Sequence, residues 1–166
     1  MSSSVISDLQ SVNPSAIIEL FTLETDAELH GSSQVYRFHN GTNLNNNGDI
    51  VWAGDQYLKM PIQATGFAFQ RGQLPRPRLS VSNALGTITA ILLNVNKVTA
   101  GNDLAGATVT RIRTLARYID AVNFPGGTNP LGTPDPTAEF PREIYKIDRK
   151  SAENRDVVEF ELAAAI

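Results

Sequence analysis

The chain is divided into short, mainly apolar runs of strand length, and residues that favour turns separate these runs. Residues 16–24 predict a buried first strand, and Gln34–His39 predict a second. Residues 142–150 and 156–165 predict an antiparallel hairpin, in which Val158, Phe160 and Leu162 face inward. The regular spacing of turn signals favours a single all-β domain over residues 1–166, mainly antiparallel, folded as a barrel or a sandwich.

Four further segments complete the predicted organisation. Ala53-Gly54-Asp55 separates two strand-like pairs of residues and predicts a hairpin turn. Gly86–Val98 fits a helix by its Leu and Ile spacing and a strand by its Thr and Val content, and we favour a short helix. Residues 1–14 predict a short helix or arm that ends before Pro14. Residues 124–141, rich in proline and glycine, predict a long loop without regular structure.

Composition excludes several classes of protein. The sequence has no cysteine, so its residues supply neither disulfides nor thiolate ligands for zinc or an iron–sulfur cluster. A net charge of -3 with mixed signs disfavours nucleic acid as a partner. The N-terminal residues lack the features of a secretory signal, and no apolar run approaches the length of a membrane span. We therefore expect synthesis and folding in a cytoplasm.

No set of residues predicts catalysis or metal binding. His30 and His39 are the only histidines, and without a nucleophile or further ligands nearby they are expected to be surface residues. The Asn-rich segment 40–49 fits a sugar or cation contact, but a flexible turn is the stronger interpretation. Trp52, Tyr57, Phe67 and Phe69 fit either a ligand groove or the core, and the core is favoured. These absences argue against an enzyme.

The strand predicted over residues 107–119 alternates between two faces. Thr108, Thr110, Ile112, Thr114, Ala116 and Tyr118 are expected on one face, and Val109, Arg111, Arg113, Leu115 and Arg117 on the other. If this strand pairs with the last one, Arg111 and Arg113 are expected to meet Glu159 and Glu161 as cross-strand charge pairs. This arginine stripe is predicted to be a solvated or interfacial face.

The residues alone leave two interpretations open: the proline-rich loop, the arginine stripe and the arm before Pro14 contact protein partners, or they are ordinary surface residues. The residues singled out for such an interface are Arg76, Arg78, Arg111, Arg113, Arg117 and the loop prolines Pro125, Pro130 and Pro134.

Three ordered motifs resemble the lambda-type phage minor tail protein L family. The first is Trp52, Gly54, Tyr57, Pro61, Ile62, Gln63, Gly66 and Phe67; the second is Arg76, Pro77, Leu79, Val81, Ser82 and Asn83; the third is Arg117, Asp120, Ala121, Val122, Asn123 and Phe124. Residues outside the stretch from Val51 to Phe124 agree with the family in strand pattern only.

The resemblance implies a structural protein of a siphophage tail tip with a tail-hub-like β domain. It implies a trimeric ring between the tail-tube adaptor, minor tail protein M, and the central tip attachment protein J. Assembly would take place in the host cytoplasm. Arg76 and Arg78 would then lie at a protomer or adaptor interface.

One departure from the family concerns its cofactor. Relatives continue into a cysteine-rich C-terminal region that looks able to hold an iron–sulfur cluster, and no cofactor is expected in these cysteine-free residues. A sugar- or receptor-binding β-module is the alternative function, and an esterase- or glycosidase-like enzyme is a third.

Overall fold

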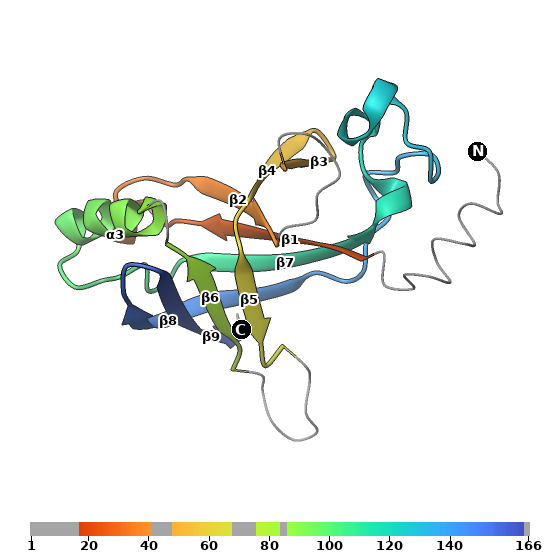
Figure 1. Cartoon of the computed structure of the whole chain (residues 1–166). Coiled ribbons are helices and arrows are strands. Elements are labelled where there is room, and N and C mark those ends of the chain that lie inside the picture. Colours follow the sequence, from red (N-terminus) through yellow and green to blue (C-terminus); the bar gives the residue numbers. More distant parts are fainter. Residues whose placement is uncertain (1–16, 41–47, 68–75, 84–85, 165–166) are drawn as a thin grey trace, which may run out of the picture. The chain divides into compact units, whose positions relative to one another are not determined.

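The computed structural model describes residues 17–40, 48–67, 76–83 and 86–164, which form nine strands and two α-helices (Figure 1). The elements are β1 Ile17–Glu24, α2 Ala27–His30, β2 Val35–His39, β3 Ile50–Trp52, β4 Asp55–Lys59, β5 Ile62–Thr65, β6 Arg78–Ser82, α3 Thr87–Val98, β7 Thr108–Leu115, β8 Glu143–Glu153 and β9 Val157–Ala164, with 3-10 turns η1 Ala116–Tyr118, η2 Ala121–Asn123 and η3 Pro125–Gly127. The chain forms two compact units, and β1, β2, β7 and β8 contribute residues to both.

The first unit comprises residues 1–21, 37–59 and 111–143. Its strand segments follow the order β3-β4-β2-β1-β7, with β2 parallel to β4 and β3 antiparallel to β4. The predicted hairpin at Ala53 and Gly54 is therefore confirmed. Its core is a cluster of buried apolar side chains: Ile18, Leu20, Ile50, Trp52, Tyr57, Ile112, Ala116, Ile119 and Phe124.

The second unit comprises residues 22–36, 60–110 and 144–166, and its strand segments follow the order β7-β8-β9-β6-β5. The pairs β5–β6, β6–β9 and β8–β9 are all antiparallel. The predicted C-terminal hairpin is confirmed, and its inward-facing residues Val158, Phe160 and Leu162 are buried as expected. Burial of these alternating side chains fixes the register, because a slip of one residue would expose them to water.

Helix α3 confirms the helical interpretation of residues 86–98. Its buried residues are Ile88, Ile91, Leu92 and Val95, which recur at the three- and four-residue spacing of one helical face. Removal of this apolar stripe from water favours the helix, although threonine and valine have weak helix propensity.

The predicted alternation along β7 is wrong at one point. Val109 was expected beside the arginines, but it is buried, as is Ile112 three residues later. Thr110 and Arg111 between them are both partly exposed, so the alternation changes phase at these two residues. The change buries two apolar side chains that a strict period of two would have placed on opposite faces.

The strand content and the mainly antiparallel pairing confirm the all-β prediction. Closure into a barrel or sandwich and the single domain over residues 1–166 stay predictions, and the predicted N-terminal helix lies outside the described residues. Within the described part of the chain, no helix has the length and apolar character needed to cross a membrane.

Candidate interaction surfaces

In the first unit, Asp120 fixes the tight turn between β3 and β4. Ala53 and Gly54 have φ values of 52° and 84°, the left-handed conformation that such two-residue hairpin turns require. The backbone N–H groups of Ala53 and Gly54 donate to the two carboxylate oxygens of Asp120, each at 2.9 Å. Two motifs that are far apart in the sequence therefore meet here, and their polar residues have a structural role.

Asn123 completes the hydrogen bonding of β3. Its side-chain oxygen accepts from the N–H of Val51, and its amide nitrogen donates to the carbonyl of Val51, both at 2.7 Å. The same amide also donates to the carbonyl of Asp120 at 2.8 Å. The Asn123 side chain thus makes with Val51 the two hydrogen bonds that a neighbouring strand would make. These bonds satisfy backbone groups of β3 that would otherwise be open to pairing with a strand of another chain.

In the second unit, the buried side chain of Asn83 joins three elements. Its amide nitrogen donates to the hydroxyl of Thr89 and to the carbonyl of Asn154 in the β8–β9 turn, and its oxygen accepts from the backbone N–H of Thr89. The last bond satisfies one of the free N–H groups in the first turn of α3, where Gly86 offers no side-chain cap. The sequence marked Asn83 only as a motif residue, without this role.

Several further motif residues also have structural roles. Trp52 and Tyr57 are buried in the core of the first unit, which confirms the core interpretation, and burial raises the pKa of the Tyr57 hydroxyl. The carbonyl of Pro61 accepts from the N–H of Ser82, and Phe67 packs edge-on against Tyr145 with ring centroids 5.3 Å apart. Gly66 has a φ of 77° and lies against the backbone of residues 76 and 77.

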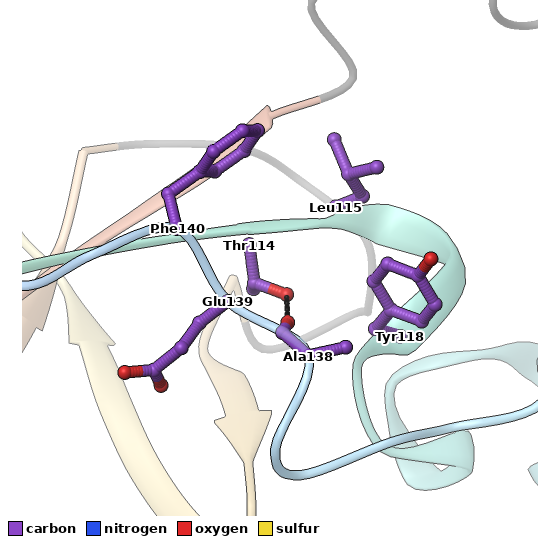
Figure 2. Close-up of a pocket in the computed structure, with 6 residues that line it drawn as sticks. All are labelled: Thr114, Leu115, Tyr118, Ala138, Glu139 and Phe140. Carbon is purple, nitrogen blue, oxygen red and sulfur yellow. Dashed lines mark hydrogen bonds between the residues drawn. The ribbon is translucent and has the colours of Figure 1, made fainter.

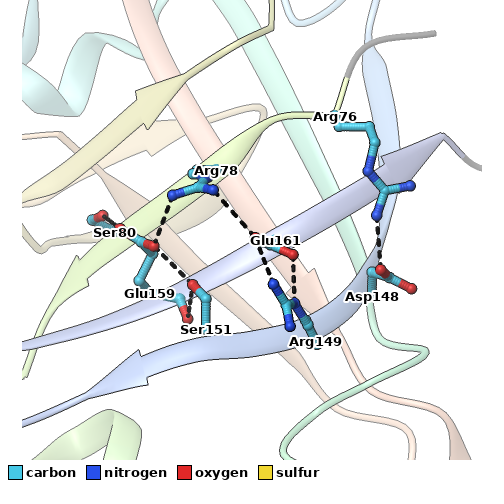
Figure 3. A network of polar contacts seen from close by, with 8 residues as sticks. All are labelled: Arg76, Arg78, Ser80, Asp148, Arg149, Ser151, Glu159 and Glu161. Carbon is cyan, nitrogen blue, oxygen red and sulfur yellow. Dashed lines mark hydrogen bonds and ion pairs between the residues drawn. The ribbon is translucent and has the colours of Figure 1, made fainter.

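The outward face of β6, β9 and β8 carries a ladder of charges (Figure 3). Glu161 lies opposite Arg78 of β6 and Arg149 of β8, with charged atoms 3.4 Å and 2.5 Å apart. Arg78 also contacts Glu159 at 3.6 Å. The hydrogen bond from Arg149 and the nearby arginine charges lower the pKa of Glu161. This charge ladder, Arg78, Glu159, Glu161 and Arg149, covers a continuous sheet face.

Arg76 and Arg78 remain accessible despite these contacts. Their side chains are 62% and 59% exposed, and Arg76 pairs with Asp148 at 2.8 Å. Each guanidinium has five N–H donors, and the ion pairs occupy only some of them. The two side chains therefore keep donors for a partner, and their interface role stays a prediction.

The predicted pairing of Arg111 and Arg113 with the glutamates of β9 is wrong. Strand β8 lies between β7 and β9 in the strand order, so β7 does not reach the last strand. Arg111 instead pairs with Glu19 at 2.5 Å and with Glu143 at 3.3 Å, and Arg113 pairs with Glu143 at 3.1 Å. All four side chains are less than a third exposed, and their charges are paired with one another. These ion pairs therefore stabilise the first unit and leave little unpaired charge for a partner.

The proline-rich loop 124–141 contains only the short turn η3 as regular structure, yet it is anchored to the first unit. The buried amide of Asn129 donates to the carbonyls of Ala116 and Ile119, and the N–H of Phe140 donates to the carbonyl of Arg113. The loop prolines predicted at an interface lie on this anchored segment: Pro125 and Pro130 are exposed, and Pro134 is half-buried.

A pocket of about 290 Å³ lies where this loop meets the end of β7 (Figure 2). It is lined by Thr114, Leu115, Tyr118, Ala138, Glu139 and Phe140. The hydroxyl of Thr114 donates to the carbonyl of Ala138 at 2.6 Å and holds the two walls together. Sequence reasoning missed this pocket, because it depends on how the loop folds back along β7.

The prediction that both histidines are surface residues is wrong. The His30 ring is buried, accepts from the N–H of Asp26 at 2.8 Å and lies 3.1 Å from the carbonyl of Ala105. The His39 ring is buried against the carbonyl of Gly48, and burial lowers its pKa. Both rings satisfy backbone groups of loops that the sequence did not place. In the described ranges, no three His, Asp or Glu side chains gather as metal ligands would.

Comparison with known proteins identifies a family and a relative. A family model described as phage minor tail protein L matches residues 29–166. Tail tip protein L of Escherichia phage lambda is 38% identical over 81 residues, which are 48% of this chain and 32% of that relative. The aligned stretch thus spans about a third of the relative's length.

Proposed function

Since the chain belongs to the phage minor tail protein L family, we propose that it builds the tail tip by assembling into a trimeric ring between the tail-tube adaptor and the central tip attachment protein. The family makes it a structural protein of the phage tail tip. The ring, its two neighbours and assembly in the host cytoplasm belong to the proposal. The observation that supports the proposal is the family match over residues 29–166, which covers most of the described part of the chain.

The charge ladder of the second unit supplies the contact chemistry in this proposal. A flat sheet face with paired charges of both signs meets a partner of complementary pattern without leaving a buried unpaired charge. Arg78 on this face and Arg76 just before β6 are suitable anchors, because both are more than half exposed and keep free donors. Arginine is also enriched among residues that dominate the energy of protein interfaces.

The experiment changes the charge of the surface with substitutions chosen to preserve the fold. In the double variant Arg76→Glu/Arg78→Glu, the new carboxylates face existing ones, so a compensating variant adds Asp148→Arg and Glu159→Arg to restore opposite charges and keeps the pair of Arg149 with Glu161. Arg155→Glu, in the exposed β8–β9 turn, is the matched control for a change of charge alone.

We expect the double and the compensated variants to remain folded and to lose ring formation when they are co-expressed with the adaptor and the central tip protein and viewed by negative-stain electron microscopy. The Arg155→Glu protein should form rings like the wild type. Normal rings from both Arg76/Arg78 variants would reject the interface, and glycan binding on an array without any ring would favour the sugar-binding alternative.

A further inference from the structure

The pocket beside loop 124–141 has a mostly apolar lining with arginine side chains at its aromatic walls. Leu115, Tyr118 and Phe140 supply apolar surface, and Phe140 is 40% exposed. The guanidinium of Arg113 lies 5.4 Å from the Phe140 ring centre, and that of Arg117 lies 4.8 Å from the Tyr118 ring centre. An occupant of this pocket therefore needs apolar side chains and gains from a negative charge.

Arg117 is the arginine beside the pocket that has no ion pair among the described residues and can therefore bind such a charge. Arg113 is paired with Glu143, and the acidic wall residue Glu139 is paired with Arg142 at 2.6 Å. The Nε atom of Arg117 is buried and, like that of Arg113, has no hydrogen-bond partner among the described residues; of the two arginines only Arg113 has an ion pair there. A buried arginine donor that lies next to an aromatic ring and lacks a partner favours a carboxylate, because burying a donor without a hydrogen bond is unfavourable.

The N-terminal end of β1 lies close to this pocket. Strands β1 and β7 are neighbours that run in opposite directions (Figure 1). Glu19 of β1 forms an ion pair with Arg111 of β7. Two residues back along β1 is Ile17, and four residues forward along β7 is Leu115, which lines the pocket. The residues that precede Ile17 are therefore joined to β1 at the end of this strand that lies nearest the pocket.

The first sixteen residues contain one short stretch with the chemistry that the pocket selects. Residues 5–9 read Val-Ile-Ser-Asp-Leu, and Asp8 is the only charged side chain before β1. Leu9 lies eight residue steps before Ile17, which gives an extended reach of about 28 Å. We propose that residues 5–9 of the chain's own N-terminal segment bind this pocket, with their apolar side chains against Leu115 and Phe140 and Asp8 beside Arg117.

The absence of native cysteine makes the proposal testable by disulfide trapping in the full chain. Ile6→Cys is combined with Ala138→Cys, whose side chain lines the pocket (Figure 2), and the rate of disulfide formation under a mild oxidant is measured at low protein concentration. The matched control combines Ile6→Cys with Leu58→Cys, an exposed position of the first unit on β4, three strands from β7 in the strand order.

We expect the pocket pair to form an intramolecular disulfide at least tenfold faster than the control pair. Adding Asp8→Lys should remove most of this advantage, and the exchange Asp8→Lys/Arg117→Glu should restore it. Asp8→Lys changes a residue outside the described fold, so it tests the charge contact without a change in the pocket.

Equal rates for the two pairs, or an advantage that is insensitive to Asp8→Lys, would overturn the proposal. A disulfide that joins two chains would also overturn it, because the segment would then bind a second copy. The inference does not rest on the tail-tip ring, so failure of the ring assay leaves this experiment unaffected.

Discussion

Replacing Asn123 with alanine should destabilise the first unit more than any other single change in its loops. The side chain is 1% exposed and makes three hydrogen bonds, two to Val51 and one to Asp120. Each contributes about 1 kcal/mol, and a buried group that loses its partner costs about 1–3 kcal/mol more. We therefore expect Asn123→Ala to lower the free energy of unfolding by about 4–6 kcal/mol, a large share of the 5–15 kcal/mol typical of a domain.

Trp52 provides the assay for this loss. It is the only tryptophan, it is buried, and it ends strand β3 next to the turn that Asp120 and Asn123 hold. Urea unfolding followed by its fluorescence should show a midpoint lower by roughly 2–3 M, given a slope of about 2 kcal/mol per molar urea. Val122→Ala, at a position 65% exposed, is the control and should shift the midpoint little. A midpoint for Asn123→Ala within about 0.3 M of the wild type would refute the proposed role.

Three further predictions concern the second unit, the buried histidine and the charge ladder. Asn83→Ala should lower the free energy of unfolding by about 2–4 kcal/mol in urea melts, because three side-chain hydrogen bonds between elements are lost; a change under about 0.5 kcal/mol would contradict this role. Burial holds the pKa of His39 below its ordinary value of 6.5, so the unfolded chain binds more protons and stability should fall as the pH drops through 6.5 toward the folded pKa. His39→Gln should reduce this pH dependence, and an unchanged profile would show that another group is responsible. Arg78→Glu should lower the urea midpoint slightly at low salt and hardly at all at high salt, since exposed pairs contribute about 0–1 kcal/mol and are screened.

The positions of strands and helices could be predicted from the local sequence pattern wherever only one face of the element is buried. Alternation alone placed Val158 and Phe160 in the core, and helical spacing selected the buried face of α3 despite its threonine and valine content. The same rule failed at Val109, because the pattern of β7 shifts by one residue to bury it together with Ile112. Local periodicity does not encode such shifts, which depend on what the neighbouring strands bury.

The hydrogen bonds and ion pairs between distant segments could not be predicted from the sequence alone. Asp120 and Asn123 lie roughly seventy residues from the hairpin they support, and nothing in their local sequence names Ala53, Gly54 or Val51 as partners. Pairing of the arginines was mispredicted for the same reason, since it depends on which strands are neighbours. Buried histidines were taken for surface residues because their acceptors and donors are backbone atoms of other loops, which no side-chain motif reveals.

The position of the protein in the intact phage tests the account most directly. Purified virions carrying an epitope on the exposed β8–β9 turn of this protein should bind gold-labelled antibody at the tail tip, and the charge-compensated Arg76/Arg78 variant should give lysates in which the folded protein sediments apart from the tails. Label that is absent from wild-type virions, or variant protein that is incorporated at wild-type levels with normal infectivity, would contradict the account.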